Sequence, residues 1–215
     1  MNENDKSLEI KKIRCIDGLY YSFEILEHFY KDLHYICCSL IKSKENVSKA
    51  LTHSWGFIDT VHRIREISKS TPGINQKSPE MRKFLDTTKV TQVFRNYIQH
   101  LNNELKKNSP NKFPVWGSLS WVDPQFKNKC HTAIFGTIIH QEKFSSCIYD
   151  RINDHWVSKV TLTINNNSYN FDPIYESVQR LKDFILQQIE NGLTTEIKIF
   201  DTLPIITTEI KIESN

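Results

Sequence analysis

Glycine is scarce in this 215-residue chain, and several common functional motifs are missing. Only six glycines occur, and none belongs to a glycine-rich phosphate loop, so the sequence favours neither a nucleotide-binding P-loop nor a dinucleotide fold. Gly-x-Ser-x-Gly is absent, so no hydrolase nucleophile elbow is predicted. No run approaches the roughly 18 apolar residues of a membrane span, and the N-terminus does not resemble a signal peptide. We therefore expect a soluble, cytoplasmic protein that makes no membrane contact.

The cysteines and histidines do not show the spacing of a metal site. The five cysteines form no Cys-x-x-Cys pair, and the eight histidines form no His-x-x-x-His pair. An odd number of cysteines without paired spacing indicates a reducing compartment and buried thiols. We predict no metal and no cofactor, although Cys130, His131, His140 and Cys147 would form a metal site if they converged in a sheet.

The composition is that of a folded protein with a mildly basic surface. Hydrophobic residues make up 39% and charged residues 25%, which is enough for a sizeable core in one domain or in two small ones. The formal net charge is +3, well short of the basic footprint of a protein that coats nucleic acid. Local contact with nucleic acid remains open.

Helical periodicity dominates the first half of the chain. Apolar residues three and four positions apart predict a long first helix that needs a partner helix, in the same chain or across a dimer. A second helix is predicted from about Asn46 to Lys69, ended by Thr71-Pro72-Gly73, and a third from about Lys89 to Lys107, after a short turn around 79–86. The predicted seam of the first helix is Ile16, Leu19, Phe23, Leu26, Tyr30, Leu33, Cys37 and Leu40; the buried stripe of the third is Val90, Phe94, Tyr97, Leu101 and Leu105, widened by Val93 and Ile98.

Short alternating runs in the second half predict an antiparallel β meander. Asn165-Asn166-Asn167 is suited to a tight hairpin turn. Asp172-Pro173 reads as an N-cap followed by proline at the first position of a last helix, which ends at Asn191-Gly192. The tail is either a pair of edge strands or a loosely ordered arm. The predicted strands are 114–122, 131–139, 144–149, 156–164 and 168–171.

We therefore predict an α+β fold in which an antiparallel sheet is inserted before the last long helix of an antiparallel helical bundle. Residues 1–109 would form the bundle, 110–172 the meander, 173–192 the helix that packs back on the bundle, and 193–215 a strand-like or flexible tail.

Arg95, Asn96 and His100 on the third helix are the candidate catalytic residues. A guanidinium group matches phosphate oxygens, and an imidazole can move a proton near neutral pH. Five positions along a helix correspond to about 140°, so one straight helix does not bring Arg95 and His100 together. A second copy of the helix related by a two-fold axis would supply the missing geometry.

The second helix carries a polar line at helical spacing, made by Trp55, Asp59, His62 and Glu66 and flanked by Arg63 and Arg65. Asp59 and Arg63 are predicted to pair four residues apart. This face is either a salt-bridged surface with one half-buried tryptophan or the border of a binding site. The strand-rich segment also carries aromatic and basic residues, including Trp116, Trp121, Arg151, His155 and Trp156, which either stack bases and contact phosphates or belong to the core.

Arg95-Asn96 followed by His100 resembles the signature of the HEPN superfamily, in which an arginine and a polar residue precede a histidine on a helix of a small bundle. The Trp-x-x-x-Asp-x-x-His-Arg and Arg-Asn-x-x-x-His-Leu segments are also similar to those of bacterial proteins with no assigned activity. The resemblance covers residues 14–108 and the last helix. It implies a dimeric bundle, and in many members a metal-independent endoribonuclease that uses the ribose hydroxyl as nucleophile.

By this resemblance, His100 would be the general acid or base, Arg95 the group that stabilises the phosphorane, and Asn96 the orienting amide. The predicted function is RNA binding in a homodimer, with metal-independent cleavage of a toxin or defence type; an antitoxin or another protein partner would accompany it. The alternative is a HEPN-like interaction module without catalysis, which binds a protein or nucleotide. The substrate-binding candidates are Trp55, Asp59, His62, Arg63, Gln99 and Asn103.

Overall fold

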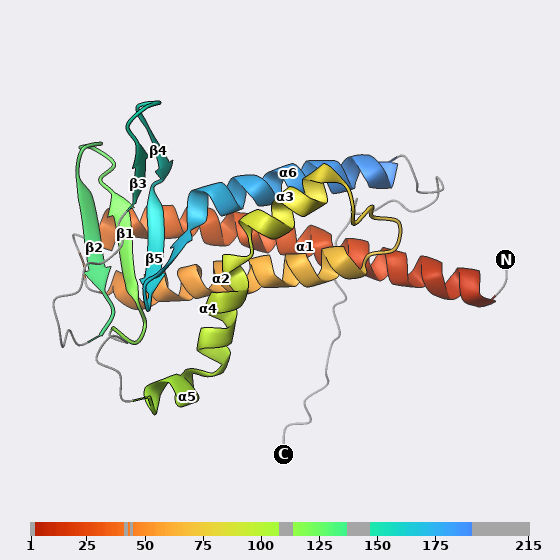
Figure 1. Cartoon of the computed structure of the whole chain (residues 1–215), viewed down its shortest axis with the longest axis horizontal. Helices are drawn as coiled ribbons and strands as arrows, with labels where there is room; N and C mark the ends of the chain where they lie inside the picture. The colour runs from red at the N-terminus through yellow and green to blue at the C-terminus, as the bar shows by residue number, and fades with distance from the viewer. Residues whose placement is uncertain (1–2, 41–42, 44, 108–113, 137–146, 191–215) are drawn as a thin grey trace, which may run out of the picture.

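Three long helices form the body of the protein, and a β-sheet closes one end (Figure 1). Helix α1 spans Glu3–Leu40, α2 Asn46–Ser70 and α6 Phe171–Glu190, and α1 runs antiparallel to the other two. The sheet lies where α1 ends, and the start of α1 extends past α2 at the opposite end. None of the helices described is long and apolar enough to cross a membrane. This computed structural model describes residues 3–40, 43, 45–107, 114–136 and 147–190.

The predicted seam of α1 is confirmed as its buried face from Ile16 to Cys37, with Tyr30 partly buried, and the side chain of Leu40 lies outside what the structure describes. Leu26 and Leu33 are fully buried, and the seam packs against α2 residues such as Phe57 and Val61. The end of α2 is also as predicted, because Thr71 takes an extended conformation after Ser70 and Gly73 adopts a φ of 87°. A partner helix for α1 is therefore present within the same chain.

The region from 79 to 107 differs from the prediction in two ways. The expected turn is a helix, α3 (Pro79–Thr87), whose N-cap Ser78 accepts a hydrogen bond from the Met81 amide at 3.2 Å. The expected third helix is interrupted at His100 (φ −107°, ψ 23°), which separates α4 (Val90–Gln99) from α5 (Leu101–Leu105).

Lack of burial explains why the predicted third helix does not continue. Val93 is 47% exposed and Leu105 is 57% exposed, although both were assigned to its buried stripe. Short helices are marginal in water and depend on packing of an apolar face. Phe94 supplies that packing for α4, whereas no residue of α5 is fully buried.

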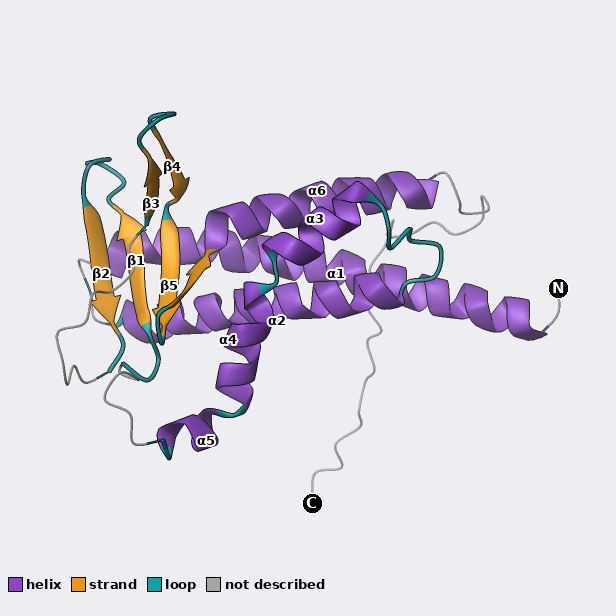
Figure 2. Cartoon of the chain, viewed as in Figure 1, coloured by secondary structure: helices purple, strands orange, loops and turns teal. Residues whose placement is uncertain are grey.

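The main sheet is antiparallel with the strand order β2-β1-β5-β6 (Figure 2). The prediction of a simple meander is therefore wrong, because β3 and β4 leave the sheet as a separate two-stranded ribbon and β1 pairs with β5. The predicted strand 156–164 is divided at Lys159 between ribbon and sheet. The strands are β1 Ser118–Val122, β2 Cys130–Ile134, β3 Ile148–Asp150, β4 His155–Ser158, β5 Val160–Ile164 and β6 Asn167–Asn170.

The predicted asparagine turn between β5 and β6 is confirmed. Asn165 and Asn166 have φ values of 47° and 66°, which are the two consecutive left-handed residues of a tight hairpin turn. Asparagine tolerates this conformation better than other residues with a side chain. The predicted end of the last helix at Asn191-Gly192, the tail 193–215, and the predicted strand segments 137–139 and 144–146 lie outside the described residues.

The sheet and the helices share one hydrophobic core. Leu119 and Leu162 stand opposite each other on β1 and β5, on the face that meets the helices, and Tyr169 of β6 contacts Phe57 and Phe94. Burial of aromatic rings at this junction contributes much of the apolar area of the core.

Asp172 was predicted to cap the last helix, but α6 already begins at Phe171 and the carboxylate has other partners. It accepts hydrogen bonds from the backbone amides of Lys159 (2.7 Å) and Val160 (3.1 Å) and from the Tyr30 hydroxyl (2.8 Å). His34 Nε2 lies 3.4 Å from Asp172 Oδ1. One buried carboxylate thereby joins α1, α6 and the corner between the ribbon and the sheet.

The surroundings of Asp172 favour its ionised form. Burial alone would raise the pKa of this carboxyl, but His34, the Tyr30 hydroxyl and the Val160 amide outweigh burial and lower the pKa below its usual value. Conversely, burial and the adjacent carboxylate raise the pKa of Tyr30, so that its hydroxyl stays protonated as a donor.

Replacement of Asp172 by alanine should destabilise the protein by about 3–5 kcal/mol at neutral pH, because two amides lose their acceptor in a buried site. Asp172→Asn should cost less, since an amide oxygen still accepts. Urea unfolding measures both, with Asp183→Ala, an exposed carboxylate of α6, as control.

The effect of Asp172 should also depend on pH. A carboxyl whose pKa is lowered in the folded state stabilises the protein at pH values above its pKa in the unfolded state, which is about 3.9. This stabilisation is lost as the pH falls through the pKa of the folded state. The difference in free energy of unfolding between wild type and Asp172→Ala should therefore become smaller at acid pH. A gap below about 1 kcal/mol at neutral pH would contradict the role of Asp172.

Candidate functional site

Arg95 reaches from α4 to α2 and forms an ion pair with Asp59 Oδ1. The other oxygen of Asp59 accepts from Arg63 Nε at 2.7 Å, which confirms the predicted pair four residues apart. Two groups of candidate residues that are far apart in the sequence therefore meet at one carboxylate. The Arg95 and Asp59 side chains are 23% and 34% exposed, so the pair lies at the surface but is not fully solvated.

Gln99 holds the Arg95 guanidinium from a second direction. With the amide oxygen turned toward the arginine, it accepts from Nη2 at 2.9 Å and from Nε at 3.2 Å. We refer to Asp59, Arg63, Arg95 and Gln99 as the Asp59 cluster. One carboxylate and two guanidinium groups leave it with one net positive charge.

His100 and Asn96 lie beside this cluster without joining it. Both are exposed, and the His100 backbone amide donates to the Asn96 carbonyl at 3.0 Å where α4 ends. The side chains of Asn96, His100 and Asn103 make no hydrogen bond to any described residue. Nor does any hydrogen bond or ion pair link Arg95 to His100 within the described part of one chain.

Trp55 and His62, the other candidates on α2, are partly buried. The Trp55 ring packs against Phe94, with ring centroids 6.2 Å apart, and so contributes to the α2–α4 contact. His62 Nδ1 and Trp55 Nε1 are buried and have no hydrogen-bond partner among the described residues. Neither side chain contacts the Asp59 cluster through a hydrogen bond.

Several contacts fix α4 against its neighbours and so position Arg95. Phe94 is buried against Tyr169, the Thr91 and Tyr169 hydroxyls lie 3.1 Å apart, and the Tyr97 hydroxyl donates to the Val115 carbonyl at 2.7 Å. Arg65 of α2 adds a contact that the sequence did not indicate. Its buried guanidinium donates to the Leu85 carbonyl at 2.7 Å and to Thr88, at the junction of α3 and α4.

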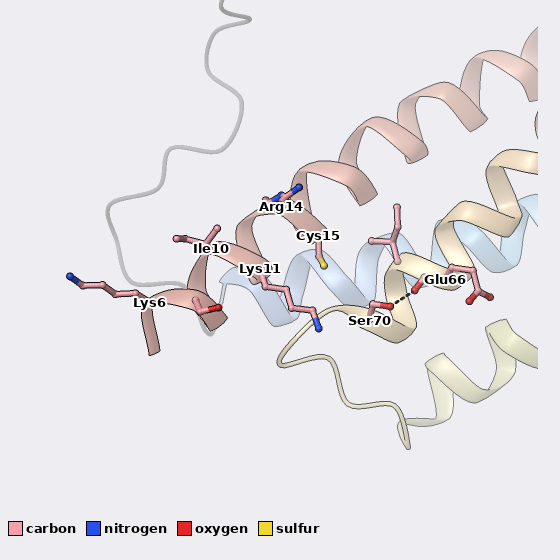
Figure 3. Close-up of a pocket in the computed structure, with 9 residues that line it drawn as sticks. Lys6, Ile10, Lys11, Arg14, Cys15, Glu66 and Ser70 are labelled. Atoms are coloured by element: carbon pink, nitrogen blue, oxygen red, sulfur yellow. Dashed lines mark hydrogen bonds between the residues drawn. The ribbon is translucent and has the colours of Figure 1, made fainter. Parts of the chain in front are cut away.

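Two pockets lie elsewhere on the described surface. One, of about 800 Å³, is formed by the start of α1 and the end of α2 (Figure 3). Its rim carries Lys6, Lys11 and Arg14 from α1 and Glu66 from α2. The other, of about 1020 Å³, lies between α1, the β1–β2 loop and the β3–β4 ribbon, and we call it the ribbon pocket. The ribbon pocket is lined by four of the aromatic and basic residues singled out in the strand-rich segment, Trp121, Arg151, His155 and Trp156, whereas no catalytic or substrate-binding candidate from α2, α4 or the residues that follow α4 lines either pocket.

Of the four residues weighed as a metal site, His131 and Cys147 make other contacts. His131 Nε2 lies 2.7 Å from Asp123 Oδ2, and this hydrogen bond, with those from backbone amides, lowers the pKa of Asp123 to about 2. The Cys147 thiol donates to the Lys159 carbonyl at 3.0 Å, and His140 lies outside the described residues. Within the described residues, no group of three or more histidine, cysteine or acidic side chains is placed to hold a metal ion.

Comparison with known proteins adds no relative to this geometry: no family model, no curated protein and no solved structure matches the chain. The resemblance to the HEPN superfamily consequently rests on Arg95, Asn96, His100 and the helices that carry them.

The Asp59–Arg95 pair should contribute more to stability than the Asp59–Arg63 pair. Exposed pairs four residues apart contribute about 0.3–0.5 kcal/mol, whereas the less exposed, doubly held Arg95 should couple to Asp59 by about 1 kcal/mol. Double-mutant cycles with Asp59→Ala, Arg95→Ala and Arg63→Ala, read by urea unfolding, measure both terms. Equal coupling energies would show that Arg95 is not held more firmly than Arg63.

Proposed function

We propose that this protein binds RNA as a homodimer with a HEPN-like helical core, and that the Asp59 cluster contacts the RNA phosphates. The observation that supports this most is the fixed Arg95 guanidinium next to exposed side chains with free hydrogen-bonding groups. Asp59 and Gln99 orient Arg95, while Asn96, His100 and Asn103 make no side-chain hydrogen bond within the described residues.

The charge of the cluster fits a phosphate ligand. Asp59 balances only one of its two arginines, so a single phosphate charge would neutralise the remainder. An arginine already held by a carboxylate and an amide also loses less rotamer freedom on binding than a free side chain does. The mild net charge of +3 fits a local contact rather than a broad basic surface.

A two-fold partner would complete the site. Val93, Asn96 and His100 are spaced three and four residues apart and are all exposed, so they form one outward stripe of α4 with an apolar residue at its start. A symmetric contact along this stripe would bury Val93 and bring two copies of His100 near one axis, with the two Arg95 side chains at either side.

Such a dimer has the groups required for metal-independent RNA cleavage. A histidine accepts the proton of the ribose 2′-hydroxyl, which attacks the neighbouring phosphorus. The bond to the 5′-oxygen then breaks, and a second protonated histidine gives that oxygen its proton. Arg95 would stabilise the charge on the pentacoordinate phosphorus. The products are a 2′,3′-cyclic phosphate and a 5′-hydroxyl end.

The second candidate function is an interaction module that binds without catalysis. It is favoured by the ion pair that already occupies Arg95 and by the position of His100 outside both pockets. In this case the same face of α2 and α4 binds RNA, a nucleotide or a protein partner, and His100 has no chemical role.

RNA binding can be tested with a fluorescently labelled single-stranded RNA at several salt concentrations. Arg95→Ala should weaken binding and reduce the slope of log K against log salt by about 0.7 per chain, because one phosphate contact is lost. Arg180→Ala removes an exposed arginine of α6 and should leave affinity and slope unchanged. No RNA binding by wild type, or equal binding by Arg95→Ala, would overturn the proposal.

Cleavage requires a separate measurement in the presence of a metal chelator. His100→Ala should lower the rate at least 100-fold, within the range for loss of a general acid or base. His28→Ala, an exposed histidine of α1, is the matched control. Binding that depends on Arg95 without cleavage that depends on His100 would establish the interaction module instead. Sedimentation equilibrium reports whether the dimer exists.

A further inference from the structure

The ribbon pocket is the larger of the two pockets, and it lies away from the Asp59 cluster. Its volume of about 1020 Å³ is at the upper end of the range of about 300–1,000 Å³ typical of small-molecule sites. α1 contributes His34 and Cys37, β1 contributes Trp121, and the β1–β2 loop and the ribbon form the remaining walls. Segments from three parts of the chain therefore converge on one concave surface.

Positive charge predominates on the walls. Lys127, Arg151 and Lys159 line the pocket, and none of them has a carboxylate partner among the described residues. The two acids that line it are already engaged, because Asp123 bonds His131 and Asp154 accepts from the Tyr149 hydroxyl. Three cations against two carboxylates leave the walls with one net positive charge, which favours an anionic ligand.

Two aromatic rings on the ribbon stand beside these cations. Tyr149 and Trp156 pack edge to face with centroids 4.9 Å apart. Trp156 Nε1 donates to the Lys127 carbonyl at 2.9 Å, so the indole is tied to the same loop that carries a cation. Tyr149 is exposed, and both residues line the pocket. A planar group can stack here at little conformational cost.

The inner wall includes the nearly buried indole of Trp121. Trp121 is 4% exposed, lines the pocket, and its Nε1 has no hydrogen-bond partner among the described residues. Buried indole N–H groups usually find an acceptor. His34, also on this wall, adds an imidazole whose Nε2 lies 3.4 Å from Asp172 Oδ1.

We propose that the ribbon pocket binds a nucleotide, with its phosphate against Lys127, Arg151 and Lys159 and its base against Tyr149 and Trp156. The nucleotide is either free or one unit of a single-stranded RNA, since both present the same base and phosphate. This site does not depend on the proposed RNA contact at Arg95, because none of the Asp59 cluster lines the pocket.

Isothermal titration calorimetry of the full chain with AMP, with adenosine and with hexa-adenylate RNA tests the proposal. The Arg151→Ala, Lys159→Ala double variant should bind AMP or the RNA at least tenfold more weakly than wild type, and adenosine should bind wild type more weakly than AMP. Both positions are exposed, so the fold should persist. The matched control, Lys31→Ala with Arg180→Ala, removes two exposed cations elsewhere and should bind as wild type does.

The probes separate the sources of the ligand. Binding of AMP identifies a free nucleotide as sufficient, whereas binding of hexa-adenylate alone identifies a strand, and either result supports the site if the double variant weakens it. Failure of both probes, or equal affinity of wild type and double variant, overturns the proposal. Arg95→Ala should leave AMP binding unchanged, so the result is independent of the test of the Asp59 cluster.

Discussion

The buried carboxylate of Asp172 is the contact on which the arrangement of helices and sheet depends. It satisfies the backbone amides at the corner where the chain passes from the ribbon to the sheet, and at the same time it accepts from Tyr30 on the longest helix. Since the ribbon pocket is built on this same corner and on His34, its shape follows from the same carboxylate.

A second constraint acts through α4, which carries Arg95 and Asn96 and ends just before His100. Phe94, Thr91 and Tyr97 hold this short helix against the sheet and the segment before β1, and the buried Arg65 holds the junction that precedes it. Arg95 is therefore placed by packing of the adjacent side of its own helix. The polar face can be occupied by a carboxylate, an amide or a phosphate without disturbing the core.

Periodicity was sufficient to predict the long helices, the inserted antiparallel sheet and the asparagine turn, because burial of one face determines each of them. Periodicity did not predict that the third helix is interrupted at His100. The residues from Gln99 onward have helical spacing, but no residue of α5 is fully buried. Periodicity also did not predict the strand pairing. The alternation in residues 156–164 does not show that Lys159 separates a strand of the ribbon from a strand of the main sheet. The ion pair between Asp59 and Arg95 depends on how α4 crosses α2, which local spacing does not encode, whereas Asp59–Arg63 follows from spacing alone.

The ribbon interrupts the main sheet in sequence but not in space, because β1 and β5 pair directly across the excursion. The length of the ribbon and its charged residues can therefore change while the hydrogen bonds of the sheet and the aromatic core beneath it stay intact. Such a layout separates the part of a protein that can diversify from the part that must be inherited unchanged.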